Sequence, residues 1–241
     1  MKTIGLIGGM SFESTAIYYE RLNGIARDTM GGLASAELLL HSVNFADIVA
    51  LQQSGRWDEA ARRLAAIAGR LEQAGADCVL ICTNTMHKVA EPVRNAISVP
   101  LIDIIDETAF ALKAGGARRP LLLATRYTME DGFYHRQMAG HGIDVAVAPQ
   151  EARGRIHSII FDELCKGKVL DHSRAEMLDI IEAAKADGAD SIILGCTEIC
   201  LLLDPDNLPL PGFDSTRIHC QSAATFAMAD TTASEQQRKY A

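Results

Sequence analysis

An internal repeat constrains the fold of this chain more than any other feature. The tripeptide Gly-Ala-Asp closes one stretch of helical periodicity at residues 75–77, and it closes another at residues 188–190. A short apolar run follows each tripeptide, at residues 78–81 and 191–194, and such runs are typical of buried strands. Because the pattern of strands and helices also restarts near residue 120, the sequence indicates a duplicated unit.

Strands alternate with helices along the chain, which favours an α/β fold with parallel sheets. We predict two pseudo-symmetric lobes, each with a mainly parallel sheet flanked by helices, and an active site in the cleft between them. The N-terminal lobe is expected over residues 1–115 and the C-terminal lobe over residues 116–230. The last helix is expected to be able to pack on the first lobe, and residues 231–241 read as a disordered tail.

The individual elements follow from apolar periodicity and from helix boundaries. The expected strands cover residues 3–7, 36–43, 78–81, 99–102, 121–124, 145–148 and 191–194. The expected helices begin with one capped by Ser11 or Ser14 and continue over residues 57–73, 91–96, 108–113, 133–138, 156–164, 173–185 and 218–228.

Composition excludes several classes of function. The chain has 241 residues, of which 48% are apolar and 22% charged, and its formal net charge is −8. This charge argues against nucleic acid or an anionic membrane as the main partner. No apolar run approaches the roughly 18 residues of a membrane span. Since a strand is expected directly after the first residues, we expect no signal peptide and a cytoplasmic location.

The six cysteines lack the spacing of a disulfide framework and of a zinc site. We therefore expect thiols and no metal ion. Two of them, Cys82 and Cys196, follow the apolar runs of the repeat. In open parallel sheets, ligands bind beyond the carboxyl ends of the strands, so the loops after the strands are the places to expect a site.

Four motifs in these loops resemble the aspartate/glutamate racemase superfamily. They are Gly-Gly-Met-Ser at 8–11, Cys-Thr-Asn-Thr-Met-His at 82–87, Thr-Arg-Tyr-Thr-Met at 125–129 and Gly-Cys-Thr-Glu at 195–198. In this order they are most similar to the aspartate racemase branch. The resemblance implies a homodimer of two-lobed chains that needs no cofactor and generally uses two cysteines, one on each face of the substrate α-carbon.

The chemistry of racemisation explains such an arrangement. One group removes the α-proton from one face, and another returns a proton to the opposite face. A thiol of lowered pKa suits this task because its thiolate is a usable base. The α-proton is very weakly acidic, so the negative charge that develops on the substrate carboxylate needs preorganised donors.

The register of the repeat departs from the two-cysteine pattern. Eight residues on from the glycine of each Gly-Ala-Asp tripeptide stand Thr83 in the first repeat and Cys196 in the second. Neighbouring residues on a strand point to opposite faces, so Cys82 and Thr83 are not expected to share a site. We predict that Cys196 is the thiol acid/base and that Thr83 lies opposite it. The alternative pair, Cys82 with Cys196, stays open from the sequence.

Other residues are expected to bind the substrate. Asn84 and Thr85 are candidates for the α-carboxylate, although both also suit a helix cap. Gln52 and Lys166 are candidates for the distal carboxylate, in competition with Arg56 and Lys168. His87 and His219 either tune the thiols or pack as structural residues. The complete set of expected substrate-binding residues is Met10, Ser11, Gln52, Asn84, Thr85, Thr125, Tyr127, Thr128, Lys166, Thr197 and Glu198.

The sequence thus predicts an isomerase, a pyridoxal-independent racemase of aspartate- or glutamate-type amino acids. The alternative is a related thiol enzyme on the same scaffold, of the hydantoin racemase or arylmalonate decarboxylase type. A non-catalytic two-lobed binding protein is disfavoured by the paired reactive strand ends. The expected partners are a small amino-acid substrate and a second copy of the chain.

Overall fold

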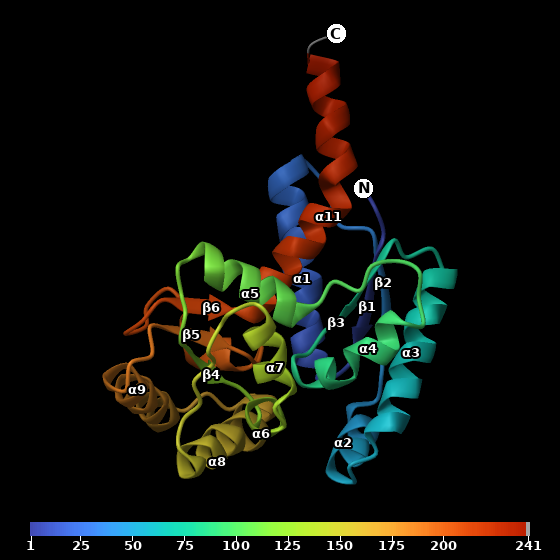
Figure 1. Cartoon of the computed structure of the whole chain (residues 1–241). Coiled ribbons are helices and arrows are strands. Elements are labelled where there is room, and N and C mark those ends of the chain that lie inside the picture. The colour runs from blue at the N-terminus through green and yellow to red at the C-terminus, as the bar shows by residue number, and fades with distance from the viewer. Residues whose placement is uncertain (240–241) are drawn as a thin grey trace. The chain divides into compact units, whose positions relative to one another are not determined.

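The computed structural model describes the backbone of residues 1–239 and the side chains of residues 1–229. It is an α/β protein with two parallel three-stranded sheets flanked by helices, as the sequence predicts (Figure 1). The chain forms two compact units with one sheet each. The first unit comprises Met1–Cys82, Val89–Asp103 and the chain from His219 onward, and the second comprises Thr83–Lys88 and Ile104–Ile218.

The sheet of the first unit has the strand order β2-β1-β3. Strand β1 is Ile4–Gly8, β2 is Leu38–Ser42 and β3 is Cys78–Ile81. Every residue of β1 is buried because this strand is central and has a partner on each side. Strand β2 forms an edge of the sheet, and its residues are only partly buried or exposed.

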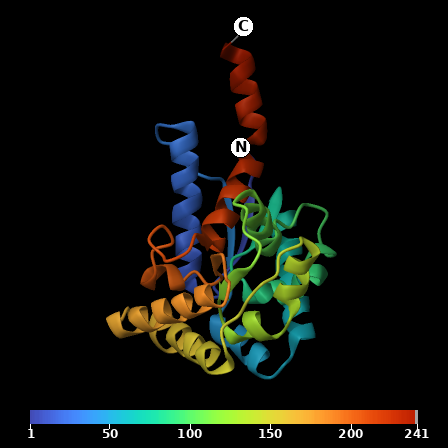
Figure 2. The same cartoon turned by 60° about the vertical axis from the view of Figure 1, so that its left-hand side comes forward.

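Helices cover both faces of this sheet (Figure 1, Figure 2). Side chains of β1 and β3 form one buried cluster with side chains of α1 and of the first turns of α11. On the opposite face β1 approaches α3, where a Cβ added to Gly5 would lie 3.3 Å from the Cβ of Leu71. The helices of this unit are α1 (Phe12–Met30), α2 (Phe45–Gln53), α3 (Trp57–Gln73) and α4 (Ala90–Arg94), together with α11 (Ser215–Lys239) from His219 onward.

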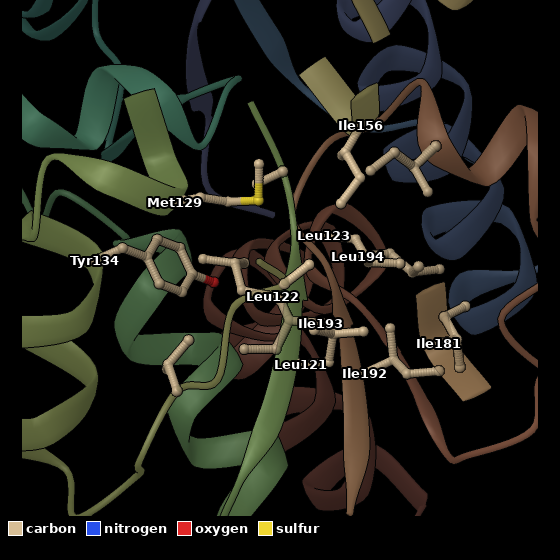
Figure 3. Packing of buried hydrophobic residues seen from close by; sticks show 14 of the residues in the cluster. Leu121, Leu122, Leu123, Met129, Tyr134, Ile156, Ile181, Ile192, Ile193 and Leu194 are labelled. Atoms are coloured by element: carbon tan, nitrogen blue, oxygen red, sulfur yellow. The ribbon is translucent and has the colours of Figure 1, made fainter. Parts of the chain in front are cut away.

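The sheet of the second unit has the strand order β4-β5-β6. Strand β4 is Pro120–Leu123, β5 is Ser191–Leu194 and β6 is Gly212–Asp214. Leucines and isoleucines of β4 and β5 pack against buried side chains of the surrounding helices (Figure 3). The helical segments are η1 (Thr85–Val89), α5 (Ile104–Ala114), α6 (Arg126–Glu130), α7 (Phe133–Gly140), α8 (Gln150–Ser158), the π-helix η2 (Ile159–Glu163), η3 (Leu164–Lys166), α9 (Asp171–Ala186) and α10 (Ile199–Leu202).

Several elements differ from the sequence-based expectation. The strands expected over 99–102 and 145–148 shrink to single bridges, Val79↔Leu101 and Leu121↔Ala146. A proline lies inside the first segment and another directly follows the second, and proline cannot donate to a strand ladder. Helix α2 and strand β6 were not predicted, and α6 occupies the expected exit loop after β4.

The compact units differ from the predicted lobes at their ends. Residues 83–88 and 104–115, which the repeat assigns to the first lobe, lie in the second compact unit. The predicted boundary follows the repeat rather than compactness, and it stays a prediction. Helix α11 extends to Lys239, so residues 231–239 of the expected disordered tail are helical. Residues 240 and 241 of that tail lie outside the described residues.

Candidate active site

The three strands of the second sheet end at the same level. Leu123 in β4 pairs with Leu194 in β5, and Leu194 pairs with Asp214 in β6. The residues that leave the sheet here begin the loops that carry Thr125, Cys196 and the start of α11. Because parallel strands present their carboxyl ends at one edge, these loops lie together at the edge where such sheets bind ligands.

Gly195 allows the close approach that places Cys196 at this edge. A Cβ at this position would meet the Leu122 Cδ1 at 2.9 Å, the Ala124 Cβ at 3.1 Å and the carbonyl oxygen of Leu123 at 3.2 Å. The Gly195 N–H donates to that same carbonyl at 2.8 Å. The glycine therefore extends the pairing of β4 and β5 by one bond, and the next residue emerges with its thiol at the strand end.

Glu198 holds the Cys196 thiol. The thiol donates to the Glu198 Oε2 over 2.9 Å, and the Thr197 hydroxyl donates to the same oxygen over 2.6 Å. Glu198 is buried, with 4% of its surface exposed, whereas Cys196 is partly exposed. Burial raises the pKa of the Cys196 thiol well above its usual range, and the Glu198 carboxylate raises that pKa further. The resting pair is therefore a neutral thiol beside a carboxylate that can accept its proton.

Three buried threonine hydroxyls form a cluster at the same edge. The Thr85 Oγ1 lies 2.9 Å from the Thr125 Oγ1 and 3.1 Å from the Thr128 Oγ1, and the last two lie 3.2 Å apart. Thr125 is also the N-cap of α6. Hydroxyl groups rotate to suit their partners, so this cluster can turn its O–H groups toward an anionic group. The structure thus brings together three of the expected substrate-binding residues.

Asn84 directly precedes Thr85 in the chain, and one end of its side-chain amide is available to a ligand. Its Nδ2 donates to the Ser215 Oγ over 3.0 Å, and the Ser215 hydroxyl donates to the Leu194 carbonyl over 2.8 Å. Because a carbonyl oxygen only accepts, this chain of bonds fixes which end of the amide faces Ser215. The Asn84 Oδ1 is buried and has no hydrogen-bond partner among the described residues. A buried oxygen of this kind is suited to accept a hydrogen bond from a ligand.

His87 and His219, whose roles the sequence left open, both use their two ring nitrogens in hydrogen bonds. The His87 Nδ1 lies 2.8 Å from the Thr83 carbonyl, so it donates, and its Nε2 accepts from the Ile104 N–H over 3.2 Å. In the first unit, the His219 Nε2 donates to the Ile102 carbonyl and its Nδ1 accepts from the Tyr18 hydroxyl, both over 2.8 Å. These contacts support the structural reading for both residues, with His87 holding the backbone at Thr83.

Cys82 and Thr83 are adjacent in the chain and have different surroundings. The Cys82 side chain is fully buried in the core of the first unit. Burial raises the pKa of this thiol well above its usual range, and the neighbouring Cys220 raises it further. Thr83 is partly exposed and belongs to the same compact unit as Cys196.

The remaining expected residues are divided between the two units. Lys166 is exposed and donates to the Asp162 Oδ1 over 3.0 Å, and Lys168 is exposed as well. The Tyr127 ring packs edge-on against His157 at 6.2 Å between centroids. Met10, Ser11 and Gln52 lie in the first unit, all three buried, with Ser11 as the N-cap of α1. The competing Arg56 is also in the first unit, where it pairs with Glu59.

Two further residues that contact these side chains, Ser215 and His157, were not predicted from the sequence. Ser215 positions Asn84, and it could have been found only by recognising that Gly212–Asp214 is a strand whose exit residue is Ser215. His157 lies between the rings of Tyr127 and Phe161, and no sequence pattern singles it out.

The described residues were also compared with two other kinds of site, a metal centre and a membrane-spanning helix. Among the side chains of residues 1–229, no three of His, Cys, Asp and Glu are grouped as ligands for a metal ion. In the part of the chain that the structure describes, every helix is too short or too polar to traverse a lipid bilayer.

The chain is similar to known proteins over most of its length. Residues 7–223 match the model of the family described as Asp/Glu/Hydantoin racemase. The chain is 23% identical to the broad specificity amino-acid racemase RacX of Bacillus subtilis (strain 168), over 94% of this chain and 98% of that protein.

Solved structures are similar over nearly the whole chain. A crystal structure of a candidate Asp/Glu racemase from Yersinia pestis superimposes with a TM-score of 0.89 at 44% identity, covering 95% of this chain and 100% of that chain. An aspartate racemase homologue from Pyrococcus horikoshii OT3 superimposes with a TM-score of 0.83 at 32% identity, covering 94% and 99%.

Proposed function

The chain belongs to the Asp/Glu/hydantoin racemase family, and we propose that it is a cofactor-independent racemase of aspartate- or glutamate-type amino acids. The observation that carries the proposal is the hydrogen bond from the Cys196 thiol to the buried Glu198 carboxylate. This pair stands at the carboxyl ends of the second sheet, in the same unit as the threonine hydroxyl cluster and the open Asn84 oxygen.

The proposed first step begins with the neutral thiol. Glu198 takes the thiol proton, which leaves a thiolate and a carboxylic acid. The thiolate then removes the substrate α-proton, so that the thiol is restored and negative charge moves onto the substrate α-carbon and carboxylate. Glu198 supplies the base that a thiol of raised pKa needs, because such a thiol holds little thiolate by itself at neutral pH.

The second proton comes from the opposite face in this proposal. The Thr83 hydroxyl gives its proton to the carbanion while it takes one from a water molecule, since a lone alkoxide would be too basic. The hydroxide that remains is neutralised by the proton held on Glu198, and the site returns to its starting state. The burial of Cys82 supports Thr83 for this position, because a thiol in the core of the first unit is out of reach of a substrate.

The two faces would then be chemically unequal. One side has a thiol with its own base, whereas the other has a hydroxyl that depends on water. We expect the enantiomer whose α-proton faces Cys196 to exchange faster than the other one. The overall equilibrium constant stays at one because the substrate and the product are enantiomers of each other.

Substrate binding is assigned by donor and acceptor character. Hydroxyls of Thr85, Thr125 and Thr128 suit the α-carboxylate because each can donate a hydrogen bond to an anion. The Asn84 Oδ1 suits the α-ammonium group because it is an acceptor. The distal carboxylate is proposed to bind Lys166 or Gln52, and Met10, Ser11, Tyr127 and Thr197 are further proposed contacts.

The proposal is tested by hydrogen exchange. The purified protein is incubated with L- or D-glutamate and L- or D-aspartate in deuterated water, and deuterium at the α-carbon and the opposite enantiomer are measured. The protein should be active without the visible absorbance of a pyridoxal Schiff base. Absence of exchange with all four substrates would contradict the proposal, and activity on a substituted hydantoin or an arylmalonate instead would favour the related thiol enzymes.

A further inference from the structure

The segment at residues 144–148 extends the sheet of the second unit beyond β4. Ala146 forms a parallel bridge with Leu121 of β4. Its N–H donates to the Pro120 carbonyl and its carbonyl accepts from the Leu122 N–H, both over 2.9 Å. Because β5 occupies the other side of β4, this segment is an edge of the sheet.

The outer backbone groups of this edge are open. In a parallel ladder every second residue bonds the neighbouring strand, so Val145 and Val147 turn their N–H and C=O groups away from β4. In the described part of the chain, these four groups make no hydrogen bond to another residue. An open strand edge is a template for a further strand, so this edge can accept an extended peptide.

An apolar groove lies beside this edge, with a volume of about 720 Å³. Leu121, residues 146–149 and one face of α9 contribute to its lining. On α9, Ile180 and Ala184 stand one helical turn apart and are partly buried, so the inner wall is apolar. Leu121 and Ala146 are bridge partners, and their side chains therefore point to the same face of the sheet, into the groove.

The outer rim of the groove is negative. Asp179 and Asp187 belong to the lining and are exposed. Among the described residues neither carboxylate has an ion-pair partner, whereas Glu176 in the same lining pairs with Arg155 over 2.8 Å. Asp187 is the C-cap residue of α9, where the helix dipole adds partial negative charge. Two uncompensated carboxylates thus stand outside an apolar wall.

Arg119 lies at the same end of the groove as Asp187. Its guanidinium donates to the Asp187 carbonyl and lies 3.9 Å from the Asp144 carboxylate. Its positive charge is therefore matched by Asp144, and the carboxylates of Asp179 and Asp187 remain for a ligand. A group with an apolar stem and a cationic end complements this arrangement, and lysine and arginine side chains have that form.

We propose that this groove binds an extended cationic peptide of a partner protein, which adds to the sheet as an antiparallel strand beside residues 144–148. Val145 and Val147 then each exchange two hydrogen bonds with one peptide residue. The peptide residue between these two faces Ala146, so its side chain points into the groove. A lysine at this position lays its stem along the apolar wall and carries its ammonium group to the acidic rim.

A peptide fits this site better than a small apolar molecule. A small apolar ligand would leave the four open backbone groups unused, whereas a strand bonds all of them. In such complexes the main-chain bonds supply affinity and the alternate side chains supply selectivity. The proposal concerns the second unit alone and does not depend on the proposed reaction.

Fluorescence anisotropy with the full chain tests the site. The labelled probe is acetyl-Val-Lys-Val-Lys-Val-amide, which alternates as the edge requires. A probe with glutamate in place of lysine should bind at least about tenfold more weakly, because like charges meet at the rim. A probe N-methylated at its valines should also bind at least about tenfold more weakly, because it lacks the N–H donors. No binding of the lysine probe, or equal binding of any two probes, would overturn the proposal.

Two variants of α9 locate the binding in the groove. Asp179→Asn should weaken binding of the lysine probe at least about threefold, and Asp171→Asn is its control on the same helix, outside the lining. Ala183→Trp should weaken binding at least about tenfold because it fills the groove, and Ala175→Trp is its control. Both alanines are exposed, so the fold tolerates the larger side chain. A variant that binds like its control would contradict the site.

Amide hydrogen exchange followed by nuclear magnetic resonance tests the strand pairing. The Val145 and Val147 N–H groups should exchange more slowly with the lysine probe bound, whereas the Ala146 N–H, already bonded to Pro120, should change little. Binding without this protection would mean that the probe only fills the groove, and would overturn the pairing. Protection that rises with protein concentration when no probe is present would assign the edge to a second copy instead.

Discussion

Replacing Glu198 by glutamine separates two roles of its carboxylate. The side chain keeps its length and an oxygen that can accept from the Cys196 thiol and the Thr197 hydroxyl, but it loses its charge and its ability to take a proton. If Glu198 is the base for the thiol, α-proton exchange should fall by about 10²–10⁴-fold, the usual contribution of a positioned general base. That range corresponds to about 3–5 kcal/mol of barrier.

The negative charge of Glu198 has the opposite effect on the Cys196 thiol, because it disfavours the thiolate and raises the pKa. Two unit negative charges 2.9 Å apart repel by roughly 6 kcal/mol at an effective dielectric constant of about 20. The pair therefore carries one negative charge at a time, and the carboxylate keeps the thiol protonated. Glu198→Gln removes this repulsion and should lower the pKa of Cys196, so that the thiol reacts with iodoacetamide at lower pH.

The two measurements together decide the role. We expect Glu198→Gln to have a more easily ionised thiol and yet slower deuterium incorporation into glutamate or aspartate. Glu130→Gln is the control, because Glu130 is also in the second unit and its carboxylate accepts from the partly buried Arg153 side chain rather than from a thiol. If Glu198→Gln retains exchange within about threefold of wild type, the base role assigned to Glu198 is wrong.

Three further predictions follow from buried groups. Thr128→Val removes one hydroxyl of the cluster and should raise KM by about 10–100-fold, with kcat changed less, as measured by steady-state kinetics; an unchanged KM would contradict carboxylate binding there. Gly195→Ala should cost about 1–3 kcal/mol of unfolding free energy, because its Cβ meets Leu122 and Ala124; a thermal melt matching wild type would contradict the close approach. Burial raises the pKa of Cys78 to about 12 from 9.0. The folded protein therefore keeps a proton that the unfolded chain loses, so stability should fall above about pH 9 by up to about 1.4 kcal/mol per pH unit. Urea unfolding at pH 8 and pH 10 should show a smaller loss in Cys78→Ala than in wild type, and equal losses would refute this assignment.

Most of what the sequence could predict about the fold came from the internal repeat. Because Gly-Ala-Asp marks a helix end and the start of a buried strand, it located β3 and β5 and therefore the loops that follow them. The repeat register also predicted different surroundings for Cys82 and Thr83, and in the structure Cys82 is buried whereas Thr83 is partly exposed. Strand β6 escaped prediction because three residues give too little periodicity to recognise.

The contacts inside the site depended on geometry that no local pattern contains. The sequence offered Glu198 only as a substrate-binding residue, whereas its carboxylate accepts a hydrogen bond from the thiol two residues away. His87 was open between a catalytic and a structural role, and its ring bridges Thr83 to the start of α5 through a contact 17 residues apart. Ser215 positions Asn84 across 131 residues of chain, a distance that only the folded sheet brings together.

The central claim is that the Cys196 thiol exchanges the substrate α-proton while Cys82 takes no part. Deuterium incorporation at the α-carbon of each enantiomer of glutamate and aspartate tests it most directly, in variants whose folding is confirmed by circular dichroism. We predict that Cys196→Ser abolishes exchange from the enantiomer whose α-proton faces Cys196 and that Cys82→Ser retains it. Exchange of that enantiomer that survives Cys196→Ser, or that is lost in a folded Cys82→Ser variant, would contradict the account.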